Sequence, residues 1–139
     1  MPKKYEFIEH TADSGLKAYG ASIEELFVHA AEGLFDVLVS TKNVEETEER
    51  VIDVDAEAVD NLMVSWLSEL LYLYDTERLV FSCFQIQQIE NNRLKAVARG
   101  EVLDPTRHEI KTGIKAVTYH QLYLEETEAG WEAQVIFDI

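Results

Sequence analysis

The chain has 139 residues, 47% of them hydrophobic, and its 27 acidic residues outnumber 12 lysines and arginines to give a formal net charge of -15. This length and apolar content predict one folded domain, residues 1–139, and argue against disorder. The charge argues against a broad nucleic-acid-binding surface, because such surfaces use lysine and arginine to displace counterions from phosphates. No apolar run reaches the ~20 residues that a membrane span needs. We therefore expect a cytoplasmic protein with no membrane partner and no direct contact with nucleic acid.

Two short strands are expected at the start of the chain, over residues 4–10 and 16–20. The connection between them, Glu9-His10-Thr11-Ala12-Asp13-Ser14-Gly15, contains two carboxylates, an imidazole and two hydroxyls. So many polar side chains in one short connection indicate a binding site. The alternative is that Asp13 only forms a turn, since aspartate before Ser-Gly favours one.

The other end of the chain also carries carboxylates. An apolar strand over residues 131–137 is followed by Asp138 and by Ile139, whose α-carboxylate ends the sequence. If the fold brings the two ends together, Asp13, Asp138 and the Ile139 carboxylate form an oxygen-rich site. Hard cations such as Ca²⁺ or Mg²⁺ prefer such oxygen ligands.

Two amphipathic helices are predicted in the middle of the chain. Ser22 and Glu25 have the spacing of a capping box, and Asp55 can cap the second helix. Apolar residues follow each cap at helical spacing: Ile23, Leu26, Phe27, Ala30, Ala31, Leu34 and Leu38 in the first helix, and Val59, Leu62, Met63, Trp66, Leu67, Leu70, Leu71 and Tyr74 in the second. Trp66 lies on the apolar stripe, which favours packing in the core over stacking on a base. His29 lies off the stripe and is expected at the surface.

The remainder of the chain is predicted to be strands. Residues 80–90 and 93–103 form a hairpin across Asn91-Asn92, because asparagine tolerates left-handed backbone angles. A strand over 114–125 and the final strand form a second hairpin around Ala129-Gly130. With one strand between the helices, the order is ββαβαββββ. It predicts an α+β domain with two helices packed on a largely antiparallel sheet.

The sequence shows no established catalytic arrangement. The four histidines lack zinc-ligand spacing, no Gly-x-Ser-x-Gly turn is present, and neither nucleotide-binding glycine motif occurs. His120 has apolar neighbours in its predicted strand and is interpreted as a hydrogen-bonded structural histidine, with a functional role as a ligand or base as the alternative. Cys83 is interpreted as a small buried hydrophobe. We therefore expect no catalytic residues and no enzyme activity.

Four motifs occur in an order and spacing that resemble the archease family. They are His10-Thr11-Ala12-Asp13-Ser14-Gly15, Arg107-His108-Glu109, Ile114-Lys115-Ala116-Val117-Thr118-Tyr119-His120, and the terminal Phe137-Asp138-Ile139. The resemblance covers the whole chain, although Lys111-Thr112-Gly113 departs from the family's pattern.

The resemblance implies that the protein activates the RtcB-type tRNA-splicing RNA ligase. Archeases promote guanylylation of that ligase, allow multiple turnovers, and can broaden its use of nucleoside triphosphates. The family binds Ca²⁺ at positions that correspond here to Asp13, Asp138 and Ile139, and Lys115 matches a lysine linked to function. Glu9 and His10 are then expected to orient Asp13, and the acidic surface is expected to dock on basic surface of the ligase.

Two alternative functions remain open from the sequence. One is a chaperone-like role that keeps an RNA-modifying enzyme, such as a tRNA methyltransferase, soluble. The other is a metal-dependent hydrolase that uses Asp13 and Asp138, for which no base–nucleophile pair is recognisable.

Overall fold

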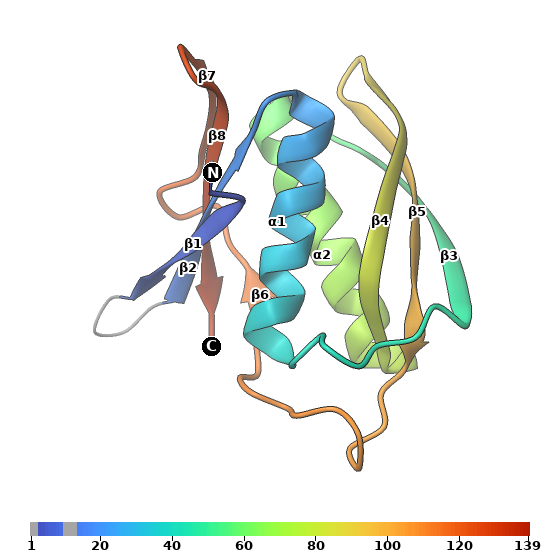
Figure 1. Ribbon diagram of the computed structural model, residues 1–139. Helices are drawn as coiled ribbons and strands as arrows, with labels where there is room; N and C mark the ends of the chain where they lie inside the picture. Colours follow the sequence, from blue (N-terminus) through green and yellow to red (C-terminus); the bar gives the residue numbers. More distant parts are fainter. Residues whose placement is uncertain (1–2, 10–13) are drawn as a thin grey trace.

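The structure is a computed structural model that describes residues 3–9 and 14–139, with Glu9 described by its backbone alone. It has two helices and two antiparallel sheets, which confirms the predicted α+β class (Figure 1). The elements in chain order are β1 (Tyr5–Glu9), β2 (Ser14–Gly20), α1 (Ile23–Leu38), β3 (Glu48–Asp55), α2 (Val59–Glu77), β4 (Leu79–Glu90), β5 (Arg93–Val102), β6 (Ala116–Val117), β7 (Tyr123–Thr127) and β8 (Gly130–Asp138).

The strands form two separate sheets where the sequence suggested one. A five-stranded sheet has the order β1-β2-β8-β6, with β7 also pairing with β8, and a three-stranded sheet has the order β3-β5-β4. The helices lie between these sheets (Figure 1). Helix α1 contacts both β2 and β4, and α2 contacts β3 and β6. A chain with two apolar helical stripes and two half-apolar sheets can bury all four faces in this three-layer arrangement.

The core is built from the predicted apolar stripes. Trp66 is fully buried, and its Nε1–H donates to the Phe27 carbonyl at 2.9 Å, which joins the two helices. Phe35 packs edge-on against both Tyr74 and Phe81. The expectation that Trp66 belongs to the core is therefore confirmed.

The two predicted helix caps have different outcomes. Ser22 Oγ accepts from the Glu25 N–H at 3.1 Å, as expected, while the Glu25 carboxylate accepts from the N–H of Ala21. The prediction for Asp55 is wrong: α2 begins after Ala58, which gives no side-chain cap, and Asp55 is the last residue of β3. The strand continues further than its apolar residues indicated, because pairing with β5 extends from Glu48 to Asp55.

The strand expected over residues 114–125 is divided in the structure. Only Ala116 and Val117 pair with β8 in its first part, and β7 resumes at Tyr123. Between them the chain turns, with Gln121 at a positive φ of 52°. The turn is held to β8 by Thr118, whose N–H and hydroxyl both donate to the Ile136 carbonyl. Five strands therefore follow α2 where four were expected.

Candidate functional site

The end of β8 holds the two predicted metal ligands that the structure describes. Asp138 and Ile139 are both exposed, and Ile139 retains 45% of its accessible surface. β8 runs between β2 and β6, and it pairs Phe137 with Ser14 and Asp138 with Ala116. Asp138 is thus fixed in the last pair of a central strand, and Ile139 follows directly after it.

The β1–β2 end of the sheet lies beside these carboxylates. Glu9 pairs with Ser14, and Ser14 pairs with Phe137. The end of β1, the start of β2 and the C-terminus consequently share one end of the five-stranded sheet (Figure 1). His10 and Asp13 lie outside the described residues.

Lys115 is held next to Asp138 by a backbone hydrogen bond. The Lys115 N–H donates to the Asp138 carbonyl at 2.7 Å. The side chain of Lys115 is exposed, and it forms no ion pair with any residue in the described part of the chain. The structure therefore brings together Lys115, Asp138 and Ile139.

A glycine allows close packing directly behind this end of the sheet. Gly15 pairs with Ile136, and a Cβ on Gly15 would lie 2.7 Å from Ile136 Cδ1 and 2.9 Å from the Val135 carbonyl. Ile136 faces away from the helices, yet it is only 2% exposed. Its neighbours Val135 and Phe137 belong to the core, so the alternation of β8 gives no sign of this burial.

The donors at this site fit a hard cation in chemical type. Asp138 and the terminal carboxylate supply oxygen only, which suits Ca²⁺ or Mg²⁺ better than zinc. Over residues 3–9 and 14–139, however, no three His, Cys, Asp or Glu side chains are grouped as metal ligands. A complete site thus requires a further donor, and Asp13 is the residue that precedes Ser14 in the chain.

Arg107 and His108, from the second motif, bind a buried carboxylate that the sequence analysis did not identify. Glu101 is 6% exposed; its Oε1 pairs with Arg107, and its Oε2 accepts from the Glu45 N–H at 2.5 Å. The Asp104 N–H donates to His108 Nδ1 at 2.9 Å, so Nδ1 carries no proton. His108 Nε2–H therefore donates to Glu101 Oε2, at 3.2 Å.

This cluster has a structural role. Burial would raise the pKa of the Glu101 carboxyl, but hydrogen bonds from Glu45, Arg107 and His108 outweigh burial and hold it below its ordinary value of 4.5. The cluster attaches the loop after β5 to the body of the domain. A lone acid near the end of an otherwise alternating strand, six residues before an Arg-His pair, was the available signal in the sequence.

The other singled-out histidines differ from their predictions. His120 is exposed, and its ring forms no hydrogen bond with the described residues, so the interpretation as a hydrogen-bonded structural histidine is wrong. The division of the strand moves His120 into a turn, where strand alternation no longer applies. His29 is half-buried rather than fully solvated, and its Nδ1–H donates to the Tyr19 carbonyl at 2.6 Å.

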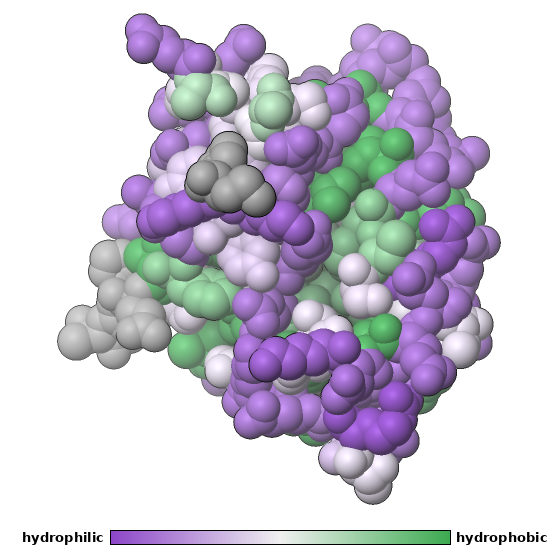
Figure 2. Space-filling model, viewed as in Figure 1, coloured by the Kyte–Doolittle hydropathy of each residue, from purple (hydrophilic) through white to green (hydrophobic). Residues whose placement is uncertain are grey.

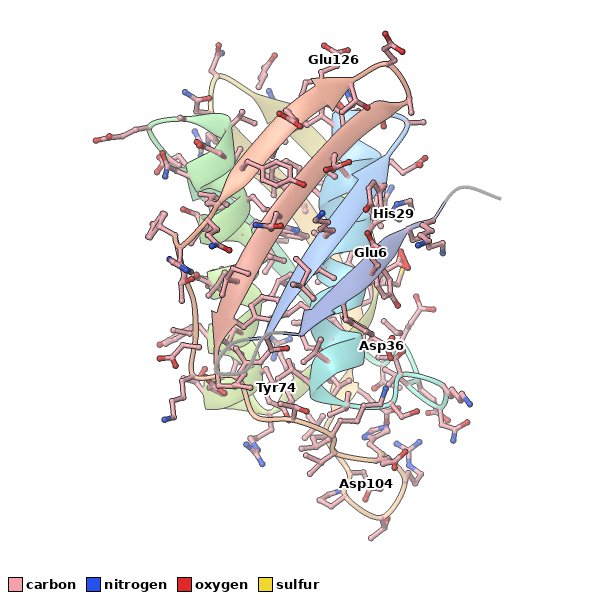
Figure 3. All side chains as sticks on the ribbon, turned by 90° about the vertical axis from the view of Figure 1, so that its left-hand side faces the viewer. Glu6, His29, Asp36, Tyr74, Asp104 and Glu126 are labelled. Atoms are coloured by element: carbon pink, nitrogen blue, oxygen red, sulfur yellow. The ribbon has the colours of Figure 1, made fainter. Side chains whose placement is uncertain are left out.

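Two tyrosine–glutamate pairs cover the outer face of the five-stranded sheet, which faces the viewer in Figure 3. Tyr19 Oη donates to Glu6 at 2.5 Å, and Tyr123 Oη donates to Glu132. Burial and the neighbouring carboxylates raise the pKa of both tyrosines, which remain neutral donors at physiological pH. These acids are satisfied within the fold and are distinct from the carboxylates at the end of β8.

In the described part of the chain, neither helix combines the length and the apolar character needed to cross a membrane. Hydrophilic residues cover most of the face in Figure 2, with apolar residues visible between α1 and β4.

Comparisons with known proteins identify the family. Residues 5–139 match the Archease protein family (MTH1598/TM1083). "Protein archease" of Methanosarcina mazei is 45% identical over 99% of this chain and 97% of its own length, and that of Thermococcus kodakarensis is 46% identical over 99% of both. The solution structure of protein 1598 of Methanobacterium thermoautotrophicum has a TM-score of 0.85 at 36% identity and covers 98% of this chain and 99% of its own. A crystal structure from Thermotoga maritima, described as an archease and possible chaperone, has a TM-score of 0.66 at 27% identity and covers 100% of this chain and 98% of its own. The chain belongs to the archease family.

Proposed function

We propose that this protein is a non-catalytic activator of an RtcB-type tRNA-splicing RNA ligase, and that the end of β8 acts on the ligase. The observation that carries the proposal is the placement of Asp138, Ile139 and Lys115 together at one exposed end of the five-stranded sheet. Family membership supports the choice of partner. The protein would promote ligase guanylylation and repeated turnover, and it would broaden the nucleoside triphosphates that the ligase accepts.

Asp13, Asp138 and the Ile139 carboxylate would hold a divalent cation, with Ca²⁺ the expected ion. Such an ion supplies positive charge that can neutralise a triphosphate. Glu9 and His10 would orient Asp13, as groups behind metal ligands commonly do. Lys115, hydrogen-bonded through its backbone to Asp138, would place its ammonium group beside the nucleotide phosphates.

The net charge of -15 supports a protein partner rather than RNA. A ligase that binds RNA and a nucleoside triphosphate needs basic surface near its active site. An acidic protein is attracted to such a surface, and the attraction raises the rate of association. The ligase would then contact RNA itself, while the activator contacts only the ligase.

Calcium binding by the isolated protein tests the metal site. We expect Asp138→Asn to weaken Ca²⁺ binding at least about tenfold in calorimetry, because one of three charged ligands is lost. Glu126→Gln is the matched control, since Glu126 is an exposed acid at the other end of the sheet (Figure 3). Equal Ca²⁺ affinity in wild type and Asp138→Asn would contradict the assignment of Asp138 as a ligand.

A chaperone-like role is the second candidate, and the description of the Thermotoga maritima relative as a possible chaperone favours it. In this role the protein would keep an RNA-modifying enzyme, such as a tRNA methyltransferase, soluble. Light scattering of a heated methyltransferase client separates the two functions. A chaperone suppresses aggregation of the client at stoichiometric amounts, and its Asp13→Ala variant does so as well as wild type. An activator suppresses aggregation in neither form.

A further inference from the structure

A groove between β3 and α2 lies apart from the carboxylates at the end of β8. It has a volume of about 750 Å³ and is lined by Asp53, Val54, Asp55, Ser65, Ser68, Glu69, Tyr72 and Arg93. One wall is the last part of an edge strand, and the other is a single face of a helix. We propose that this groove, hereafter the β3–α2 groove, binds an extended basic segment of a partner protein, which adds to the sheet beside β3.

The backbone of β3 can pair with another strand on its free side. β3 is the outer strand of the three-stranded sheet, and among the described residues its eight residues pair on one side only, with β5. An edge strand directs alternate N–H and C=O groups away from its sheet, and these groups can bind an extended peptide. Among the described residues, the side chain of Arg50 donates to the Glu49 carbonyl at 2.8 Å, at the start of this edge. At residues 53–55, by contrast, the free edge of β3 borders the groove.

The helical wall leaves space for a strand. Ser65, Ser68, Glu69 and Tyr72 have the spacing of one face of α2, and the two serines are small. Tyr72 is 59% exposed, although large aromatic side chains usually bury more of their surface. Arg50 bonds to Glu77 at 2.9 Å, so it joins β3 to the end of α2.

The charges in the groove select a basic occupant. Arg93 is bound to Asp53 by two hydrogen bonds, at 2.9 and 2.8 Å. Asp55 and Glu69 form no ion pair within the part of the chain that the structure describes. These two acids lie on opposite walls, so alternate side chains of an added strand can meet one or the other. A second copy of this chain is disfavoured by its own charge of -15.

The proposal does not depend on the ligase or on a metal. The test uses isotope-labelled full-length protein, NMR titration, and the peptide Ac-Lys-Val-Lys-Val-Lys-Val-Lys-NH₂ as the probe. We expect amide shifts concentrated at Asp53–Asp55 and on α2 from Ser65 to Tyr72. Peptides methylated on alternate backbone nitrogens distinguish strand addition from charge attraction. One methylation register should abolish binding, and the other should preserve it.

Two variants address the helical wall. Glu69→Lys should weaken peptide binding about tenfold, because an attraction becomes a repulsion, and Ser68→Tyr should block binding by filling the groove. Glu109→Lys makes the same charge change at an exposed acid in the segment between β5 and β6, and should leave binding within about twofold. Circular dichroism confirms the fold of each variant. Shifts spread over the whole acidic surface, equal binding by both methylated peptides, or equal losses in Glu69→Lys and Glu109→Lys would overturn the proposal.

Discussion

Glu101 is the residue whose protonation most directly links pH to the stability of this fold. Its carboxylate is almost completely buried, and it accepts hydrogen bonds from a guanidinium, an imidazole and a backbone N–H. A buried carboxylate with these partners stabilises the native state only while it is charged. In the unfolded chain it titrates near its ordinary value, whereas in the native state its pKa is lower.

The sign of the pH dependence follows from that difference. The stabilisation by Glu101 is fully present above a pH of 4.5, and it is lost as the pH falls from there through the lowered native pKa. We expect Glu101→Gln to reduce the free energy of unfolding at neutral pH by about 2–4 kcal/mol. The variant should also lose less stability than wild type on acidification. Urea unfolding from neutral to acid pH measures both effects, with Glu126→Gln as an exposed control. Parallel curves for wild type and Glu101→Gln would contradict this account.

Gly15 shows how one residue sets the packing beneath the candidate metal site. We expect Gly15→Ala to destabilise the fold by about 1–3 kcal/mol, because the new methyl would meet Ile136 and the backbone of Val135. Gly113→Ala is the matched control, since a Cβ there meets nothing within 4 Å. Thermal unfolding compares the two variants, and equal melting temperatures would show that the sheet yields at Gly15.

At the scale of elements, the sequence predicted a helix or hairpin correctly where the spacing of residues within the segment determines which side is buried. The apolar stripe that includes Leu34 predicted α1, and the stripe that includes Trp66 predicted α2. Asn91-Asn92 predicted a hairpin, and these two asparagines have φ of 52° and 58°. Tertiary contacts decided the remaining features. Alternation across 114–125 suggested one strand, but the chain turns after Thr118, with Gln121 in the left-handed region, and the bonds from Thr118 to Ile136 hold this turn to β8.

The candidate site was predictable in part, for the same reason. The concentration of carboxylates at both ends of the sequence indicated Asp138 and Ile139, and strand pairing places them beside Lys115. Two features depend on contacts between distant segments: the burial of Ile136 on the outer face of the sheet and the carboxylate cluster at Glu101. The spacing of residues within one segment cannot predict such contacts. The prediction for Asp13 remains a prediction.

The turn that divides β6 from β7 gives a prediction about an element. Gln121 occupies the left-handed region, which disfavours side chains but suits glycine. We expect Gln121→Gly to raise the free energy of unfolding by about 0.5–1 kcal/mol. The hydrogen bond from Gln134 Nε2 uses the backbone carbonyl of residue 121 and would be retained. Chemical denaturation measures the change, and a less stable variant would contradict the argument.

At the scale of the whole molecule, the architecture separates two faces of the domain. The carboxylates at the end of β8 belong to the five-stranded sheet, and the β3–α2 groove belongs to the three-stranded sheet on the other side of the helices (Figure 1). The chain carries a net charge of -15, so association with a basic partner should weaken as salt is added. Two separate contact sites on one small domain would allow one to hold a partner while the other acts on it.

Guanylylation of the matching ligase is the measurement that tests the central claim most directly. The ligase is incubated with GTP and divalent metal, and this protein is added below stoichiometric amounts as wild type, Asp13→Ala, Asp138→Asn or Glu126→Gln. We predict that wild type and Glu126→Gln accelerate guanylylation and support repeated turnover, and that Asp13→Ala and Asp138→Asn abolish both effects while they remain folded by circular dichroism. No stimulation by folded wild-type protein would contradict the activator function, and full stimulation by Asp138→Asn would contradict the role of the end of β8.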